Sequence, residues 1–401
     1  MQIGEVASFQ NGYAFKSKDF VQDGKYKIIK IKELKDGKVR FFNDSASVNV
    51  DDERIIEKYI ADKGDVLFAL TGDPVNKNNP LSWVGRVSVY EDDQLALLNQ
   101  RVCKLVPKEG INAKYIYYYF RAFDNFYALA SIAKGSASQA NISTKDIEAM
   151  EIALPSLNIQ NKIVLVLDSI EEKINQNNKI NNNLEQQAQA LYQELFITNA
   201  NPEWKTGTIN DIGTVVGGST PSKSKPEYYT EKGIAWITPK DLSVNKSKFV
   251  VRGENDITET GLKNSSASIM PEGTVLFSSR APIGYIAIAA GEVTTNQGFK
   301  SVVPKPEIGT PFIYYFLKAN LQVIEGMASG STFKEVSGST MKIVPAFIPD
   351  VETISRFNDF CIPLFAQQRV LEEQNKALSS IRDGLLPKLM SGELDVSDID
   401  L

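Results

Sequence analysis

The sequence predicts an α+β protein with two tandem domains of mixed α/β structure and a pair of long antiparallel coiled-coil helices, in a pseudo-two-fold arrangement. Three observations predict this architecture. Most of the chain occurs twice, each copy contains many short strand-like runs, and each copy ends in a long segment with one shared heptad pattern. A chain of 401 residues is long enough for two separate cores, and 42% hydrophobic with 23% charged residues is ordinary for a folded protein.

The repeat is clearest around an asparagine-glutamine pair and a tyrosine-rich run. Asn99-Gln100 recurs as Asn296-Gln297, 197 residues later, and Ile116–Phe120 recurs as Ile313–Phe316 at the same distance. In both copies, runs of β-branched and aromatic residues alternate with Gly, Asn and Asp, which predicts short strands joined by tight turns. We expect the tyrosines to form the apolar face of a short helix rather than an exposed stacking platform.

Each copy is followed by a segment whose apolar residues recur at alternating steps of four and three, the pattern of a coiled-coil seam. Each seam position in the second segment lies 194 residues after its counterpart in the first. The main apolar members of this predicted seam are Ile163, Leu167, Ile170, Ile174, Leu184, Leu191, Leu195, Phe357, Leu364, Leu371, Leu378, Leu385 and Leu389. Polar residues also occupy seam positions, where they cost stability but fix register: Asn177, Asn181, Gln368, Asn375 and Arg382.

The two helices are expected to pack on each other, because roughly 35 residues of helix rise about 50 Å and exceed the width of one small domain. Packing of each helix on its own domain is the alternative. With one helix between the domains, an antiparallel pair with a domain at each end is favoured. Pro363 lacks an amide hydrogen, so the second helix should kink or restart near Cys361. The predicted boundaries are residues 1–156 and 198–350 for the domains, 157–197 and 351–392 for the helices, and 393–401 for a C-terminal tail.

Positive charge is concentrated at matching places in the two copies, although the net charge is −5. Nine Lys and Arg face four acids between Lys16 and Arg40, and seven face three between Thr214 and Arg252. Such excesses are often only solvated surface. At matching places in a repeat, they fit a pair of stripes that face phosphate groups. Two such modules on a rigid spacer would suit two short sequences a fixed distance apart on a duplex.

The composition argues against catalysis by this chain. The absence of histidine excludes imidazole metal sites and the Ser-His and Cys-His dyads. The sequence also lacks an [ND]PP[YFW] tetrapeptide, a GxGxG-type cofactor loop after a strand and a GxxxxGK[ST] phosphate loop. Cys103 and Cys361 have no CxxC spacing, so we expect both to be buried as small hydrophobes.

We expect acidic pairs such as Asp51-Asp52 and Asp92-Asp93 to be solvated turns, and we predict no metal site. The first residues do not resemble a secretory leader, and no apolar run approaches the length of a membrane span. A cytoplasmic location is therefore expected.

A set of motifs in a fixed order links the chain to a known family. They are Gly4-Glu5-Val6, Gly217-Gly218-Ser219-Thr220-Pro221, Trp236-Ile237-Thr238-Pro239-Lys240-Asp241-Leu242, Thr295-Asn296-Gln297-Gly298, and the ending LLPKLMSGEL at Leu385 to Leu394. Each is weak alone. Together with the duplicated helices, they resemble the specificity subunit of type I restriction-modification systems across essentially the whole chain.

This resemblance implies a sequence-specific, non-catalytic subunit with two target recognition domains, each reading one half of a split double-stranded DNA target. It also implies helices that dock two methyltransferase subunits and, through them, restriction and translocase subunits. S-adenosylmethionine is then expected on the methyltransferase subunits, with no cofactor on this chain. Ala14-Phe15-Lys16-Ser17 stands where the second copy has Ser219-Thr220-Pro221, so the half-sites should differ. The alternatives are a free-standing DNA-binding or regulatory protein and an interaction scaffold without a DNA role.

The candidate DNA contacts are polar or basic residues on loops whose glycines permit a close approach to phosphate. In the first copy they are Lys16, Lys18, Arg86, Gln100, Ser136, Ser138 and Gln139. In the second copy they are Ser219, Lys223, Arg280, Gln297, Ser331, Thr332 and Lys334. The alternative for each is an ordinary turn residue, because only groove geometry separates base reading from backbone positioning.

Overall fold

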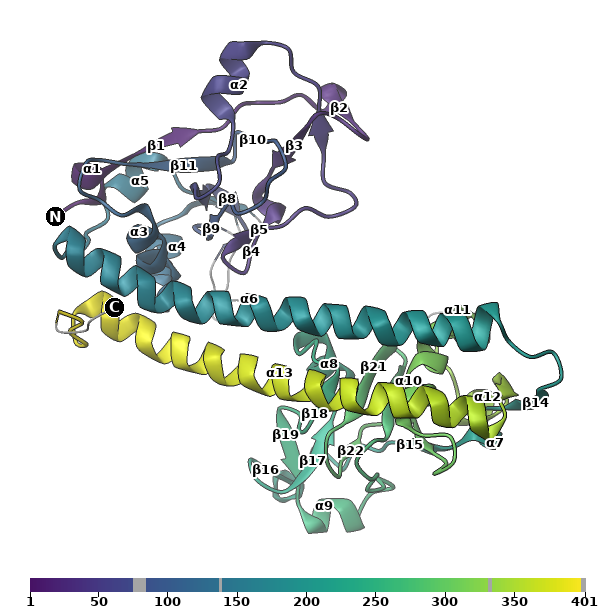
Figure 1. Cartoon of the computed structure of the whole chain (residues 1–401). Coiled ribbons are helices and arrows are strands. Elements are labelled where there is room, and N and C mark those ends of the chain that lie inside the picture. Colours follow the sequence, from purple (N-terminus) through teal and green to yellow (C-terminus); the bar gives the residue numbers. More distant parts are fainter. Residues whose placement is uncertain (75–83, 137–138, 331–333, 398–401) are drawn as a thin grey trace. The chain divides into compact units, whose positions relative to one another are not determined.

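A computed structural model describes residues 1–74, 84–136, 139–330 and 334–397. The chain forms two compact units, residues 1–173 with 377–401 and residues 174–376. Each unit contains one domain and a part of each of the two long helices, α6 (Leu157–Gln193) and α13 (Val351–Ser391). Figure 1 traces these elements along the chain. No helix in the described ranges is both long enough and apolar enough to cross a membrane.

Within its described residues the first domain contains three sheets, five short α-helices and the 3₁₀ helices Ser17–Asp19 and Ile31–Glu33. Its main sheet has the strand order β1 (Ala7–Asn11), β11 (Val102–Pro107), β7 (Val66–Ala69), β9 (Val87–Val89), β5 (Lys38–Val39) and β4 (Leu34–Lys35). A second sheet has the order β10 (Ala96–Leu98), β3 (Tyr26–Ile29), β6 (Ser47–Val48) and β2 (Phe20–Val21), and a third the order β12 (Lys134–Ser136), β13 (Gln139–Asn141) and β8 (Thr71–Gly72). The helices are α1 (Ile3–Val6), α2 (Glu53–Tyr59), α3 (Ala113–Arg121), α4 (Phe123–Ser131) and α5 (Thr144–Glu148).

The second domain repeats this plan. Its main sheet runs β15 (Gly213–Gly217), β23 (Lys300–Pro304), β20 (Val275–Ser279), β21 (Ile283–Ala289) and β18 (Phe249–Val250). Its second sheet runs β16 (Tyr229–Thr230), β19 (Asn255–Ile257), β17 (Ile234–Ile237) and β22 (Thr294–Thr295), and β14 (Lys205–Thr208) pairs with β24 (Pro345–Ile348). The helices are α7 (Ile209–Ile212), α8 (Pro239–Val244), α9 (Glu259–Lys263), α10 (Thr310–Ala319), α11 (Leu321–Gly326) and α12 (Gly338–Lys342).

The register of the strands shows that the sequence repeat is a structural repeat. Ala7 of β1 lies opposite Pro107 of β11, and Gly213 of β15 lies opposite Pro304 of β23. In each domain a short parallel pair joins the second sheet, β3 with β10 and β17 with β22. The predicted class, two mixed α/β domains with long helices, is therefore confirmed.

The tyrosine-rich runs form α3 and α10, and their side chains are mostly buried. Tyr115, Tyr118 and Phe120 of α3 belong to the first core, and Phe312 and Tyr315 of α10 belong to the second. The interpretation of these runs as the apolar face of a short helix is confirmed.

The α6 and α13 segments run antiparallel within each unit. In the first unit Arg382 Nη1 contacts Glu171 Oε1 at 2.8 Å. In the second unit Asn177 Nδ2 donates to Asn375 Oδ1 at 2.9 Å, and Gln368 Nε2 donates to the carbonyl of Asn181 at 3.3 Å. Residue numbers therefore rise on α6 as those of the partners fall on α13.

Every residue of the predicted seam is buried or half-buried. The first unit buries Ile163, Leu167 and Leu389 together with its domain, and the second unit does the same with Phe357. The seam residues thus pack both on the partner helix segment and on the adjoining domain. The two packing modes that the sequence left as alternatives coexist.

Pro363 was expected to kink or restart the second helix, and of these two effects the restart does not occur, because α13 is continuous from Val351 to Ser391. Pro363 and Asp359, whose carbonyl loses its helical amide partner, both lie on the exposed side of the helix. Water can solvate that carbonyl, which lets a helix continue through proline.

A buried ion pair joins the second domain to both helices of its unit. The ammonium of Lys248, just before β18, lies 2.9 Å from Glu185 Oε2 on α6 and 2.9 Å from Gln368 Oε1 on α13. It also lies 3.4 Å from the centre of the Phe365 ring. Burial alone would raise the pKa of Glu185, but Lys248 and Lys318 lower it to about 2. The carboxylate is therefore held in its charged form.

The substitution Glu185→Gln is expected to destabilise the protein by about 3 kcal/mol at pH 7, because it leaves the Lys248 ammonium buried without its counter-ion. Urea unfolding monitored by circular dichroism measures this loss. The double variant Glu185→Gln with Lys248→Met removes both charges and should recover most of the stability; equal stability of single and double variants would contradict this account. Since the folded pKa of Glu185 is lowered, the advantage of wild type over Glu185→Gln is present above about pH 4.5 and shrinks as the pH falls toward 2.

Candidate nucleic-acid interface

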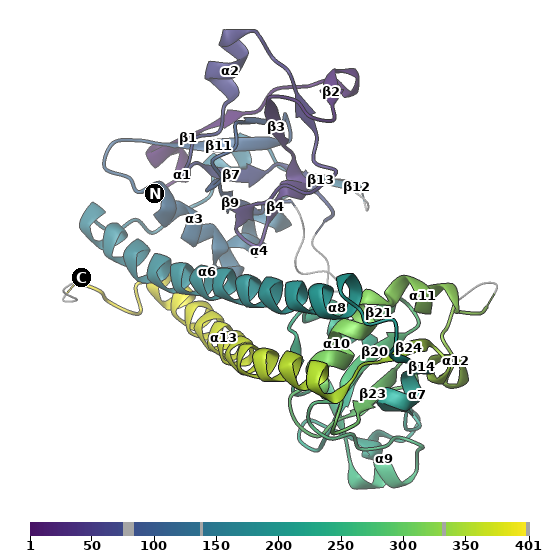
Figure 2. The ribbon, with the colours of Figure 1, turned by 45° about the vertical axis from the view of Figure 1, so that its right-hand side comes forward.

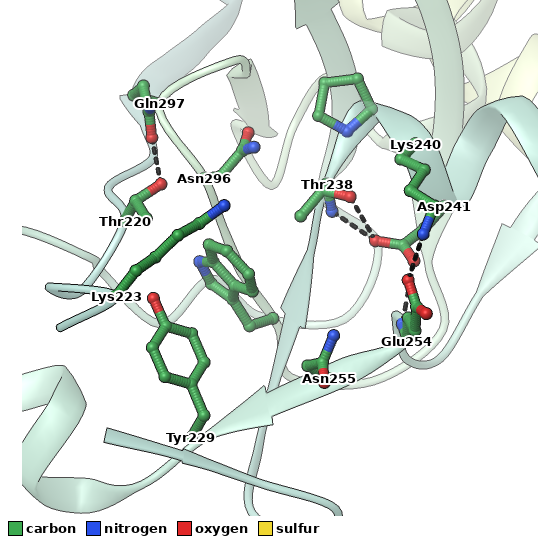
Figure 3. A pocket seen from close by; sticks show the side chains of 12 residues that line it. Thr220, Lys223, Tyr229, Thr238, Lys240, Asp241, Glu254, Asn255, Asn296 and Gln297 are labelled. Atoms are coloured by element: carbon green, nitrogen blue, oxygen red, sulfur yellow. Dashed lines mark hydrogen bonds and ion pairs between the residues drawn. The ribbon is translucent and has the colours of Figure 1, made fainter. Parts of the chain in front are cut away.

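A cavity of about 620 Å³ opens in the second domain beside the turn that precedes β23. Its wall is aromatic, because Trp236 of β17 and Tyr229 of β16 line it with ring centres 5.7 Å apart (Figure 3). Trp236 Nε1 donates to the carbonyl of Ser219 at 3.0 Å, and the Tyr229 hydroxyl donates to the carbonyl of Pro221 at 2.6 Å. The strands thereby hold the loop that follows β15 against the cavity.

Polar groups line the opposite sides of the cavity. The hydroxyl of Thr220 donates to Gln297 Oε1, and Lys223 extends from the same loop toward Asn296 (Figure 3). On the other side, Asp241 Oδ2 accepts from the Thr238 amide and hydroxyl at 2.7 Å each, while its second oxygen accepts from the Glu254 amide at 2.9 Å. Donors, acceptors and an aromatic wall in one concave surface suit a polar ligand with flat rings.

A glycine allows the loop to approach the turn. A Cβ atom on Gly218 would overlap the carbonyl oxygens of Asn296 and Thr295. The first domain repeats this contact, since a Cβ on Gly12 would overlap the carbonyl of Asn99. Both candidate surfaces depend on a position with no room for a side chain.

A second polar group lies next to the cavity in the same domain. Lys300 Nζ donates to the carbonyl of Gln297 at 3.2 Å and lies 3.5 Å from Glu335 Oε1. Arg280 Nη1 lies 3.5 Å from the other oxygen of Glu335. Four predicted contacts, Ser219, Lys223, Arg280 and Gln297, thus belong to one connected surface.

Of the remaining candidates of the second copy, Lys334 lies within the described residues. Lys334 is exposed and directly precedes Glu335. Ser331 and Thr332 fall outside the described residues.

The first domain has an equivalent surface with different side chains. Gln100 is exposed at the turn before β11, and its backbone amide donates to the backbone carbonyl of Tyr13 at 2.9 Å. Gln139 Nε2 donates to the Thr71 hydroxyl at 3.2 Å. Lys30 stands where the second domain has Thr238, and its ammonium lies 3.9 Å from the centre of the Phe20 ring. Burial lowers the pKa of Lys30, which Glu33 partly opposes.

The other candidates of the first copy that the structure describes are Lys16, Lys18, Ser136 and Arg86. Lys16 and Lys18 are exposed at the short turn Ser17–Asp19. Ser136 ends β12, and Ser138 falls outside the described residues. Arg86 is half-buried before β9, where burial lowers the pKa of its guanidinium and the carboxylates of Asp36 and Asp73 partly oppose this shift.

Several cations of the two basic segments, which were interpreted as stripes that face phosphate groups, contact acids in the structure. In the second stripe Lys248 is buried on Glu185, and Lys240 pairs with Glu254 at 2.7 Å. In the first stripe Lys32 pairs with Asp44 at 2.8 Å. Acids distant in sequence neutralise these cations, so fewer of them are available to a polyanion.

Sequence reasoning did not assign several residues that shape the surface: Trp236, Tyr229, Thr238, Asp241, Lys300, Glu335, Thr71 and Asn141. A signal existed for part of this set, because Trp236, Thr238 and Asp241 all belong to one of the family motifs. Their contribution is a hydrogen-bonded frame around the cavity, which depends on contacts between distant strands.

The two cysteines and the acidic pairs have structural surroundings. Cys103 and Cys361 are free and buried, as expected. Asp52 caps α2 through the Arg54 amide, and Asp93 pairs with Lys63 at 2.8 Å. Across residues 1–74, 84–136, 139–330 and 334–397, no cluster of three His, Cys, Asp or Glu is arranged to hold a metal ion.

Comparison with known proteins identifies the family. A family model for the type I restriction modification DNA specificity domain matches residues 1–186 and, a second time, residues 201–372. The chain belongs to this specificity family. Both copies of the repeat are matched, so the family assignment covers both domains and most of α6 and α13.

Curated relatives and a solved structure agree with the specificity family. The specificity subunit of the type I restriction enzyme MjaIX of Methanocaldococcus jannaschii is 40% identical over 191 residues, which are 45% of this chain and 44% of that subunit. The alignment thus spans less than half of that relative. The HindI specificity subunit of Haemophilus influenzae is 23% identical over 344 residues, 67% of this chain and 74% of that one. The crystal structure of the S subunit from M. genitalium has the same fold, with a TM-score of 0.63 and 16% identity over 99% of this chain and 96% of that one.

The substitution Gly218→Ala is expected to lower the free energy of unfolding by about 1–3 kcal/mol, because the new methyl group displaces the loop from the turn at Asn296. Urea unfolding followed by tryptophan fluorescence measures the change, with Trp236 as a local reporter. Gly291→Ala is the matched control, since a Cβ there meets nothing within 4 Å. Equal stabilities of the two variants would contradict the close approach.

Proposed function

We propose that the chain is the DNA-reading, non-catalytic subunit of a type I restriction-modification complex, with each domain reading one half of a split target. One observation carries the proposal: the two domains present the same backbone with different polar side chains. The amide of Asn99 donates to the carbonyl of Ile29 and that of Asn296 to the carbonyl of Ile237, both at 3.0 Å. A shared frame with unlike side chains suits two unlike half-sites.

The helices are proposed to dock two methyltransferase subunits, which bind S-adenosylmethionine and connect the chain to restriction subunits. Support comes from apolar side chains on the outer side of the helices. Ile362, Val370 and Ile381 of α13 are at least half exposed, and Leu165 and Ile180 of α6 are also exposed. A contiguous exposed apolar patch is typical of a surface that a partner covers, and these side chains are the candidates for such a patch on the helices.

Val370→Glu is expected to weaken methyltransferase binding about tenfold, because a charge would be buried in the docking surface. Isothermal titration with the purified methyltransferase subunit measures the change. The control is Gln367→Glu, an exposed position of the same helix. Light scattering should find two methyltransferase subunits per wild-type chain. A chain that binds its DNA target but no methyltransferase would favour the free-standing regulator, and a chain that binds only protein would favour the scaffold.

The helices are also proposed to set the distance between the half-sites. The 37 residues of α6 rise about 55 Å, equal to roughly 16 base pairs at 3.4 Å each. Domain width shortens the gap, so we expect half-sites of about 3–5 base pairs with an unspecified spacer of about 5–8.

A matched deletion of one heptad from each helix is expected to shorten the spacer by about 3 base pairs, because it removes about 10 Å of rise. The segments are Lys173–Lys179 of α6 and Glu373–Ser379 of α13. The bonds of Asn177 to Gln374 and Asn375 lie within the deleted segments, whereas Glu171 with Arg382 and Asn181 with Gln368 are retained. The seam therefore stays in register.

Methylome sequencing of cells that carry the matched deletion, beside wild type, measures the spacer. The half-site sequences serve as the internal control and should not change. An unchanged spacer in an assembled complex would refute the role of the helices, and altered half-sites would show that the readers and the helices are not separable.

A further inference from the structure

Two pairs of residues occupy the same backbone position in the two domains but differ completely in chemistry. Thr71 lies opposite Asn141 in the first domain, and Arg280 lies opposite Glu335 in the second. The residues adjacent to these pairs make the same backbone hydrogen bond in both domains. The amide of Ile142 donates to the carbonyl of Leu70 at 3.0 Å, and that of Val336 to the carbonyl of Ser279 at 3.0 Å.

In the second domain the pair presents a guanidinium that shares its carboxylate partner with a second cation. Glu335 lies 3.5 Å from both Arg280 and Lys300, so one carboxylate is shared by two cations at long contacts. The Arg280 side chain is 37% exposed, which leaves part of its planar fork accessible to a ligand. Guanidinium groups held in this way suit the two acceptors, O6 and N7, at the major-groove edge of guanine.

In the first domain Thr71, at the position of Arg280, orients the side-chain amide of Gln139. The Thr71 hydroxyl donates to Asn141 Oδ1 at 2.7 Å and accepts from Gln139 Nε2 at 3.2 Å. Gln139 itself is exposed at the start of β13, on the hairpin that β12 and β13 form (Figure 2). The bond to Thr71 uses one hydrogen of its amide. The second hydrogen and the oxygen match N7 and the N6 amino group of adenine.

From this contrast we infer that Arg280 determines a guanine in one half-site and that Gln139, held by Thr71, determines an adenine in the other. The inference rests on the proposed function, because it assumes that these surfaces face the major groove. Identical pairs such as Gln100 and Gln297 cannot distinguish the half-sites. Thr71 and Arg280 differ at matched positions and can distinguish them, Arg280 directly and Thr71 through the Gln139 that it holds.

The test uses the complex with its methyltransferase subunits and duplexes that carry the target found by methylome sequencing. Each guanine of the two half-sites is replaced in turn by 7-deazaguanine, which lacks the N7 acceptor. Wild type is expected to lose about 10–100-fold in affinity at one guanine of one half-site. Arg280→Gln should lose a similar factor on unmodified DNA and should be insensitive to that same replacement.

Lys334→Gln, at an exposed neighbouring cation, is the matched control and should weaken binding to all duplexes alike. The reciprocal arm pairs Gln139→Ala with 7-deazaadenine in the other half-site. Recognition of the half-site that is not mutated reports correct folding in every variant.

Arg280→Gln that weakens all duplexes equally, or that stays sensitive to the same 7-deazaguanine, would overturn the inference and leave Arg280 as a phosphate contact. That outcome differs from failure of the proposed function, in which the wild-type complex would show no half-site preference at all.

Discussion

A contact that leaves no room for a side chain holds each candidate reading surface together. Gly12 and Gly218 let the loops after β1 and β15 lie against the carbonyls of Asn99 and Asn296, respectively. In the second domain this approach brings the loop that carries Ser219 and Lys223 beside the turn at Asn296 and Gln297. The contact and the asparagine-glutamine pair are the same in both domains, whereas other polar side chains of the surface differ.

The duplication made much of the architecture readable from the sequence. The Asn-Gln pairs, the tyrosine runs and the heptads of α6 and α13 are local patterns with a fixed period, and such patterns depend mainly on burial of one face. They correctly placed the two mixed domains, the short helices α3 and α10 and the long helices. The surface was only partly readable, because Ser219, Lys223, Arg280 and Gln297 were found through their loop positions while Trp236 and Glu335 were not.

The errors have two different physical origins. Lys248 looked like one member of a basic stripe, but Glu185 lies 63 residues before it and holds it inside the protein. Pro363 looked like a helix break, but its position on the exposed side removes most of the cost of the lost hydrogen bond. The partner of Lys248 is distant in sequence, so no local pattern could reveal it, whereas the heptad frame already places Pro363 outside the seam.

The polar seam also matters for the order in which the chain is made. Translation proceeds at about 5–20 residues per second, so a ribosome that has finished α6 needs roughly 10–40 s to complete α13. During this interval the half of α6 beyond Ile174 lacks its partner helix. A fully apolar stripe would then invite aggregation, whereas Asn177 and Asn181 keep the waiting surface hydrated. When α13 arrives, Asn375 and Gln368 meet these asparagines, and a helix that slides by one heptad would bury Arg382 away from Glu171. The polar residues of the seam thus keep the unpaired helix hydrated before α13 is made and fix the register of the two helices when they pair.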